Sequence, residues 1–180
     1  MRDSALQNFF HIVGADGDSY NLPSNWWGNY LAVVNANLGG EKSDAFIDEV
    51  IDLQINLDTS GSSQNDLTVT RTHRGNSRTE AWYRATNNNF IQLFTPMGAN
   101  LISVVGNSVT PKTKSKLNYD GEGYERDVDV AALEKKQVFL TDMKTNKGTT
   151  DDKSIFGTWF NVKAGETKKM NVRYDVPASN

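Results

Sequence analysis

Alternation of apolar and polar residues near the carboxyl end constrains the fold of this chain most strongly. In the stretch 169–176 every second residue is apolar, namely Met170, Val172, Tyr174 and Val176. A period of two indicates a β-strand with one buried and one solvated face. A similar pattern precedes the turn at 164–167, and Pro177 ends the strand because proline has no N–H to donate. We therefore expect a terminal antiparallel hairpin over 155–177, with which the remaining strands pair.

The same signal recurs upstream. Ile51, Leu53, Ile55 and Leu57 alternate with polar residues, and the Ser- and Gly-rich stretch 59–65 separates them from a second strand over 67–72. This predicts a long hairpin with an open tip. Further strands are expected at 30–36, 90–95, 101–105 and 138–141, and loops at 14–28, 107–127 and 142–154. A short helix is predicted at 3–13, with Asp3 or Ser4 as its amino-terminal cap. A second is predicted at 127–136, where aspartates at the start and Lys135-Lys136 at the end suit the helix dipole.

About eight strands with little helix predict an all-β, immunoglobulin-like antiparallel β-sandwich with one or two short peripheral helices. A chain of 180 residues is long enough for one such core. We expect residues 29–180 to form the sandwich domain. Residues 1–28 are interpreted as a short helix and a loop that remain from an upstream region.

The amino-acid composition excludes several kinds of site and makes some partners less plausible. The absence of cysteine excludes disulfides, thiolate metal sites and cysteine nucleophiles. A net charge of −3 does not indicate a nucleic-acid partner, and the small basic cluster at Lys112, Lys114 and Lys116 is typical of a solvated loop. No long apolar run occurs near the amino end, so this stretch predicts neither a signal peptide nor membrane contact by this part of the protein.

One stretch carries a recognisable motif. An apolar strand in YLAVVNANLGGEKSDAFI, residues 30–47, leads into Asn-x-Gly-Gly-x-Lys-Ser, formed by Asn37, Gly39, Gly40, Lys42 and Ser43. Two later features follow in order: Tyr83-Arg84 before a strand and a Pro-x-Gly at Pro96 and Gly98, and a closing Phe-Gly, Gly-Glu and Tyr-x-x-Pro pattern. Together they resemble the carboxy-terminal part of a bacterial domain-of-unknown-function family, number 4012, over about residues 28–177. Ala164 departs from that pattern, in which proline is usual, and the stretch after Asn107 is longer than expected.

The resemblance implies a membrane-anchored bacterial protein that faces outward, with an upstream half beyond this chain. It places the chain at the cell surface and suggests envelope proteins or surface polysaccharide as partners. It transfers no catalytic residue to any position of this sequence.

Enzyme chemistry has little support in the residues themselves. The two histidines, His11 and His73, belong to no recognisable catalytic pattern, and we expect both to be exposed or to cap backbone groups. The Asp151-Asp152 pair lies in a predicted turn, where solvated carboxylates are usual. No Gly-rich loop leads from a strand into a helix, so no nucleotide cofactor is predicted. We expect a protein that is not an enzyme and binds no cofactor.

Calcium is the most plausible ion, because carboxylates lie close together in two loops. The candidates are Asp16 and Asp18 in GADGDSYN, and Asp120 and Glu122 in YDGEGY. Neither stretch continues with the ligand spacing and glycine of an EF-hand loop, so ordinary turn chemistry is the favoured interpretation and no metal is expected.

Aromatic residues suggest a second hypothesis. Sugar rings could stack on a platform formed by Trp26, Trp27, Trp82, Tyr83 and Trp159, with Asn87, Asn88 and Asn89 as hydrogen-bonding partners. The alternative, which we favour, is that these rings pack over the ends of the sandwich, since tryptophan is highly buried on average. The Asn37–Gly40 stretch is interpreted as backbone chemistry, because glycines adopt conformations closed to other residues.

The sequence therefore predicts a non-catalytic extracellular β-sandwich module of a bacterial cell-envelope protein, used for surface presentation or protein contacts. One alternative is a carbohydrate-binding module that uses exposed tryptophans. The other is the accessory half of an envelope enzyme whose active site lies upstream. The loops named above would carry the contacts.

Overall fold

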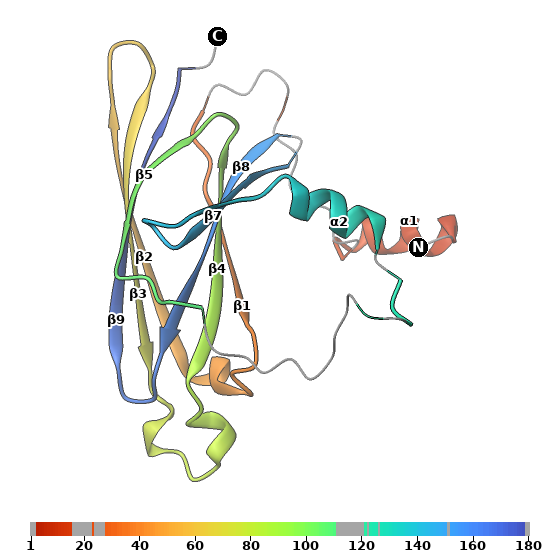
Figure 1. Cartoon of the computed structure of the whole chain (residues 1–180), viewed down its shortest axis with the longest axis vertical. Coiled ribbons are helices and arrows are strands. Elements are labelled where there is room, and N and C mark those ends of the chain that lie inside the picture. Colours follow the sequence, from red (N-terminus) through yellow and green to blue (C-terminus); the bar gives the residue numbers. More distant parts are fainter. Residues whose placement is uncertain are drawn as a thin grey trace.

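A computed structural model describes residues 3–15, 23, 28–110, 121, 123–125, 127–150 and 152–178. Two antiparallel sheets face each other along the length of the molecule (Figure 1). Sheet A has the order β1-β4-β8-β7-β6, with β1 Ala32–Asn37, β4 Asn87–Pro96, β8 Lys153–Val162, β7 Thr145–Thr149 and β6 Val138–Leu140. Sheet B has the order β2-β3-β9-β5, with β2 Ile47–Leu57, β3 Ser63–His73, β9 Thr167–Val176 and β5 Asn100–Val105. The predicted all-β antiparallel sandwich with short helices is confirmed.

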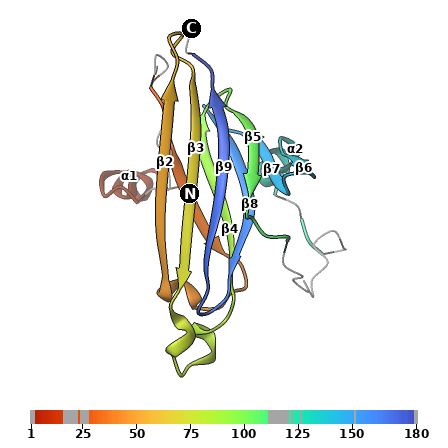
Figure 2. The ribbon, with the colours of Figure 1, turned by 90° about the vertical axis from the view of Figure 1, so that its left-hand side faces the viewer.

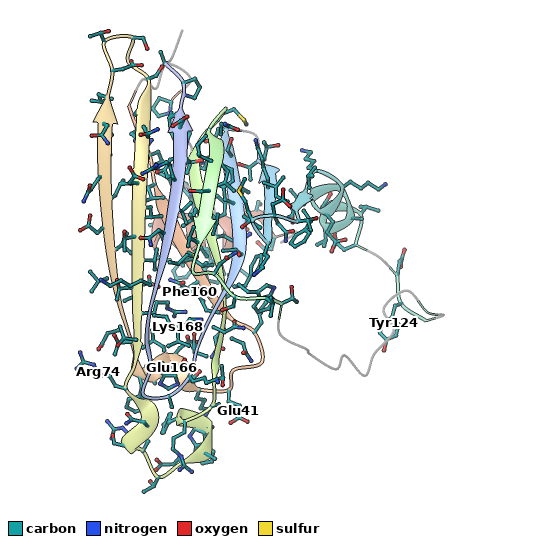
Figure 3. All side chains as sticks on the ribbon, turned by 60° about the vertical axis from the view of Figure 1, so that its left-hand side comes forward. Glu41, Arg74, Tyr124, Phe160, Glu166 and Lys168 are labelled. Atoms are coloured by element: carbon teal, nitrogen blue, oxygen red, sulfur yellow. The ribbon has the colours of Figure 1, made fainter. Side chains whose placement is uncertain are left out.

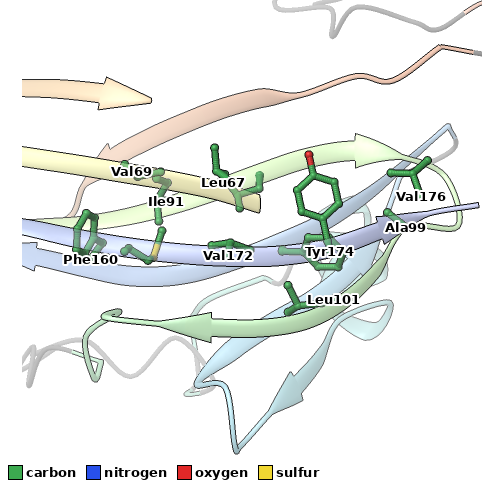
Figure 4. Close-up of a cluster of buried hydrophobic side chains, with 12 residues drawn as sticks. Leu67, Val69, Ile91, Ala99, Leu101, Phe160, Val172, Tyr174 and Val176 are labelled. Atoms are coloured by element: carbon green, nitrogen blue, oxygen red, sulfur yellow. The ribbon is translucent and has the colours of Figure 1, made fainter. Parts of the chain in front are cut away.

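The core lies between the sheets, where the alternating apolar residues meet (Figure 4). Strand β9 contributes Met170, Val172 and Tyr174, each no more than 2% exposed. Strand β4 contributes Ile91 and Leu93 from the opposite sheet. Each strand buries every second side chain because successive residues point to opposite faces.

The predicted terminal hairpin is wrong in one respect. Strands β8 and β9 follow each other in sequence, but β8 pairs with β4 and β7 in sheet A, and β9 pairs with β3 and β5 in sheet B. The turn between them carries the chain from one sheet to the other, with Gly165 at φ +87°. Glu166 (Figure 3) secures this turn, since its carboxylate accepts from the Lys163 N–H at 3.1 Å. Their apolar residues therefore face each other across the core.

The predicted loop 142–154 contains a strand. Residues Thr145–Thr149 form β7, which pairs with both β6 and β8. Its sequence, TNKGT, has no apolar alternation, because backbone pairing to β8 needs none. Strand β4 also begins earlier than predicted, at Asn87, so that a run of asparagines enters the sheet.

Both predicted helices are present. Helix α1 spans Ser4–Ile12, and the Asp3 carboxylate accepts from the backbone N–H groups of Ala5 and Leu6. Helix α2 spans Val128–Lys135 and is capped by Asp127 in the same way. Both helices lie beyond sheet A (Figure 1), beside opposite edges of the sandwich (Figure 2), and α1 has no buried residue. Neither these nor any other described helix is long and apolar enough to cross a membrane. The proposed boundary at residue 28 stays a prediction.

Candidate functional site

A buried polar cluster fills one end of the space between the sheets. Arg71 of β3 is 3% exposed, and its Nη1 donates to Asn87 Oδ1 of β4 at 3.0 Å. Its Nε lies 3.1 Å from Glu49 Oε2 of β2, which forms an ion pair. The Asn87 amide in turn donates to Asp44 Oδ1 at 2.7 Å and to the Ser43 hydroxyl at 3.1 Å. The cluster thus joins β2, β3, β4 and the 3₁₀ turn Ser43–Phe46.

The Asn-x-Gly-Gly-x-Lys-Ser motif belongs to this cluster. Asn37 donates to the Ser43 hydroxyl at 3.1 Å and accepts from the Asn88 N–H at 3.1 Å. A Cβ on Gly40 would lie 1.8 Å from Asn37 Oδ1, and Gly39 has φ +73°. The interpretation of these glycines as backbone chemistry is therefore confirmed: Gly40 lets the chain pass close to the Asn37 amide, and Gly39 adopts a positive φ.

The charged groups of the cluster interact with one another, since Arg71 lies close to both Glu49 and Asp44. Burial lowers the pKa of the Arg71 guanidinium below its usual value, and the charges of Glu49 and Asp44 oppose that shift. The guanidinium stays charged, because even a lowered arginine pKa lies far above neutrality. Its partners are protein groups on three other segments. This arrangement holds the two sheets together.

The structure decides the expectations about the two histidines and about the Asp151-Asp152 pair. His73 is fully buried and caps backbone groups, the second of the two expected alternatives: its Nδ1 accepts from the Gly75 N–H at 3.0 Å, and its Nε2 lies 2.9 Å from the Ala85 carbonyl. These two contacts fix the tautomer with hydrogen on Nε2. Asp152 lies in a bend and is half-buried, and both its oxygens accept from the Nζ of Lys153, which is 1% exposed, whereas Asp151 lies outside the described residues. His11 is exposed, as expected.

The predicted aromatic platform is distributed over separate elements. Trp82 is 45% exposed and contacts Tyr83, whose ring packs on Phe46 at a centroid distance of 4.8 Å. Trp159 lies instead on the outer face of sheet A, where it is half-buried and its ring centroid lies 5.3 Å from that of Phe90. Trp26 and Trp27 lie outside the described residues.

The positions of Asn87, Asn88 and Asn89 do not fit the hypothesis that they donate hydrogen bonds to an external ligand. Asn87 and Asn89 are fully buried because they point between the sheets, and Asn89 donates to Asn35 Oδ1 at 2.8 Å. Asn88 is half-buried. The calcium candidates Asp16, Asp18, Asp120 and Glu122 all lie outside the described residues. Within the residues that the structure describes, no group of three or more acidic or histidine side chains could hold a metal ion.

Strand β2 exposes apolar side chains that point toward the core side of sheet B. Ile51, Ile55 and Leu57 pair with Val69, Asn65 and Ser63 of β3, which are all buried, so both strands turn the same face inward. Yet Ile51 and Ile55 are each 44% exposed, and Leu57 is 73% exposed. Only Leu53 of this stripe is half-buried against the core. We call Ile51, Leu53, Ile55 and Leu57 the β2 stripe.

The β2 stripe is uncovered because sheet A ends before it. Strand β2 is the edge of sheet B (Figure 2), and the facing edge of sheet A is the six-residue β1. Asn35 of β1 donates to Glu49 Oε1 of β2 at 2.9 Å, and Asn29, just before β1, donates to Asn65 Oδ1 of β3 at 2.6 Å. Strand β2 continues for eight residues beyond Glu49, and the β2 stripe lies in this part of the strand. The sequence signals the alternation but does not indicate that its apolar face stays accessible.

A pocket of about 240 Å³ lies on the outer face of sheet A, beside the carboxyl end of α2. Phe90 and Phe94 of β4 line it together with the amides of Gln92, Asn146 and Gln137. No charged side chain occurs among its described lining residues. Gly157 of β8 opens the hollow, since a Cβ there would lie 2.8 Å from the Phe90 ring. A glycine inside a strand is the sequence signal that could have pointed to this site.

Comparison with known proteins gives no relative, since no family model, no curated protein and no solved structure matches this chain.

Proposed function

We propose that this chain is a non-catalytic β-sandwich module that makes protein contacts at the surface of a bacterial cell envelope. The observation that carries the proposal is the β2 stripe, an apolar row on an edge strand with Leu57 73% exposed. Contiguous exposed apolar surface on a soluble domain marks sites of interaction. The envelope setting comes from the sequence resemblance described above.

The internal pairing of the polar cluster supports a non-catalytic role. Arg71, Asn87 and Ser43 are each at most 3% exposed, and their polar groups contact one another. A catalytic group has to reach a substrate, whereas these side chains bind the sheets to each other. The rigid sandwich then serves to present its edges and faces to a partner.

Site-specific photocrosslinking in bacteria that carry the parent protein tests the proposal. A photoreactive residue replaces Leu57 on the inner side of β2 or, as the matched control, Gln54 on the outer side of the same strand. We expect a discrete adduct with another protein from position 57 and little from position 54. Equal yields at the two positions, or adducts only within the chain itself, would contradict a protein-contact function for this edge.

A carbohydrate-binding function is the second candidate, and the pocket beside α2 supports it. Aromatic rings and side-chain amides line the pocket, and none of its described lining residues is charged. This lining suits a neutral sugar, because the rings pack on its C–H face and the amides donate to and accept from its hydroxyls. At about 240 Å³ the pocket is small, so it suits a single ring. Trp159 does not line the pocket but contacts Phe90, which does.

Titration with neutral hexose oligosaccharides, read by tryptophan fluorescence, tests this candidate. The expected result is a saturable change that Phe90→Ala abolishes and Trp82→Ala preserves, because Trp82 contacts Tyr83 at another place. A flat response from a folded sample would reject the carbohydrate function and leave the protein-contact function untouched.

A further inference from the structure

Strand β2 is an unusually unprotected edge. It has eleven residues, and its ladder with β3 runs over all eleven without a register shift. Natural edge strands avoid unwanted pairing through short length, proline, bulges, charged side chains, inward-pointing charged residues or a covering segment. Between Ile47 and Leu57 there is no proline, lysine or arginine. Glu49 is the one inward-pointing charge between Ile47 and Leu57, and it is paired with Arg71 at 3.1 Å. Beyond Glu49 the strand is long and regular, and Asp52 is its only charged residue.

The other described edges differ from β2. Strand β5, at the far side of sheet B, has six residues and a register shift between Leu101 and Ser103. Strand β1 has six residues and β6 only three. Among the described strands, β2 alone offers a long and regular row of backbone groups. Alternate residues of an edge strand direct their N–H and C=O groups away from the sheet, where an added strand can bind them.

The side chains of β2 indicate what an added strand would carry. On the inner side, the β2 stripe would meet apolar residues at every second position of the incoming strand. The remaining residues of that strand would lie on the outer side, beside Asp48 and Asp52. Asp48 pairs with Arg74, whereas no described residue forms an ion pair with Asp52.

Charge argues against a second copy of this chain as the occupant. Strand β2 carries Asp48, Glu49 and Asp52 with no basic residue, and Asp44 and Asp58 flank it. Pairing two such strands would bring acidic residues of both copies together, and like charges on neighbouring strands are destabilising. A basic partner would compensate Asp52 instead.

We infer that β2 accepts an extended strand of a partner protein in which apolar residues alternate with lysine or arginine. The added strand continues sheet B, covers the β2 stripe and places its basic side chains beside Asp52. The inference rests on the proposed protein-contact function and adds the binding mode and the chemistry of the partner.

The test uses a labelled ten-residue peptide of alternating valine and lysine, with fluorescence anisotropy and amide hydrogen exchange as readouts. We expect binding that slows exchange in β2, that weakens at least ten-fold when glutamate replaces lysine, and that weakens at least ten-fold when alternate backbone nitrogens are methylated. The last comparison separates strand addition from side-chain contact, because methylation removes N–H donors and keeps the apolar residues.

Matched variants of β2 complete the test. Ile55→Lys and Gln54→Lys change the charge equally, but only the first disrupts the β2 stripe. We expect Ile55→Lys to weaken binding at least five-fold more than Gln54→Lys, and Asp52→Asn to weaken it about three-fold.

Four outcomes would overturn the inference. One is equal binding of the lysine and glutamate peptides, and another is slowed exchange in β5 rather than β2. The third is a dimer of this chain, detected by sedimentation and dissociated by Ile55→Lys, which would make a second copy the occupant. The last is that methylation of the peptide backbone leaves binding unchanged. If the photocrosslinking adduct at position 57 persists in that case, strand addition is rejected and the protein-contact function stands. Loss of that adduct would reject the function itself.

Discussion

Arg71 of β3 and Asn87 of β4 face each other across the two sheets, and the guanidinium donates to the Asn87 amide oxygen at 3.0 Å. This contact joins strands of different sheets through charged and amide groups at one end of the space between the sheets. Glu49 supplies the compensating charge at 3.1 Å, and its side chain is 20% exposed. The stability of the sandwich should therefore depend on a polar cluster as well as on its apolar centre.

Arg71→Met should lower the free energy of unfolding by about 3–5 kcal/mol, because removal of one partner leaves buried polar groups uncompensated. Urea denaturation measures this change. Arg173→Met is the matched control, since Arg173 is exposed on the same sheet and pairs with Asp66. Exposed ion pairs contribute little, so the control should unfold close to the wild type. A similar effect of both substitutions would contradict a structural role for the cluster.

Tyr174→Phe should leave the free energy of unfolding unchanged or raise it by about 1 kcal/mol. Tyr174 is fully buried, and its hydroxyl has no hydrogen-bond partner among the described residues. Removing a buried hydroxyl that lacks a partner eliminates its desolvation cost and keeps the packing of the ring. Thermal and urea unfolding measure the effect, and a loss of more than about 1 kcal/mol would indicate a partner for the hydroxyl.

The same residue predicts a dependence of stability on alkaline pH. Burial raises the pKa of Tyr174 from 10.0 to about 12. The folded state therefore holds the phenolic proton more tightly than the unfolded state does, and the stabilisation is complete below pH 10. It is lost as the pH rises from 10 to 12, by about 2–3 kcal/mol in total. Subtracting the pH profile of Tyr174→Phe isolates this contribution, and parallel profiles would refute it.

Substitutions of the neighbouring residues Gly39 and Gly40 provide a matched pair of stability measurements. Gly40→Ala should destabilise by about 3 kcal/mol or more, because a Cβ would lie 1.8 Å from Asn37 Oδ1 and displace an amide that holds Asn88 and Ser43. Gly39→Ala should cost only about 1–2 kcal/mol, since φ is +73° but nothing lies within 4 Å of the added Cβ. Chemical denaturation of both variants checks the order, and the reverse order would show that the Asn37 amide can move.

Local features of the fold could be predicted because they depend on neighbouring residues. Asp3, one of the two expected candidates, caps the first helix, since an aspartate side chain reaches the N–H groups two and three residues ahead. Asp127 caps the second helix in the same way, where the sequence had indicated a favourable helix dipole. The long β2–β3 hairpin was likewise predictable, because both strands carry a signal and a turn-forming stretch separates them. Strand β7 was missed because its pairing needs only backbone groups.

The candidate sites were much less predictable. Asn87 and Asn89 were considered as partners of a sugar only in the less favoured hypothesis, and they lie inside the sandwich, because strand register rather than residue type decides which way a side chain points. The pocket beside α2 combines residues from β4, β7, β8 and α2, whose proximity no local pattern encodes. Trp82 and Trp159 were grouped by residue type and belong to different elements.

The sequence by itself determined the all-β class, the two capped helices and which residues of each strand share a face. These properties follow from the period of two and from hydrogen bonds that span a few residues. Only the tertiary structure decided that β8 and β9 belong to different sheets, and that the apolar face of β2 stays uncovered. Alternation specifies that a face is apolar, whereas the length and position of the opposite sheet determine what covers it.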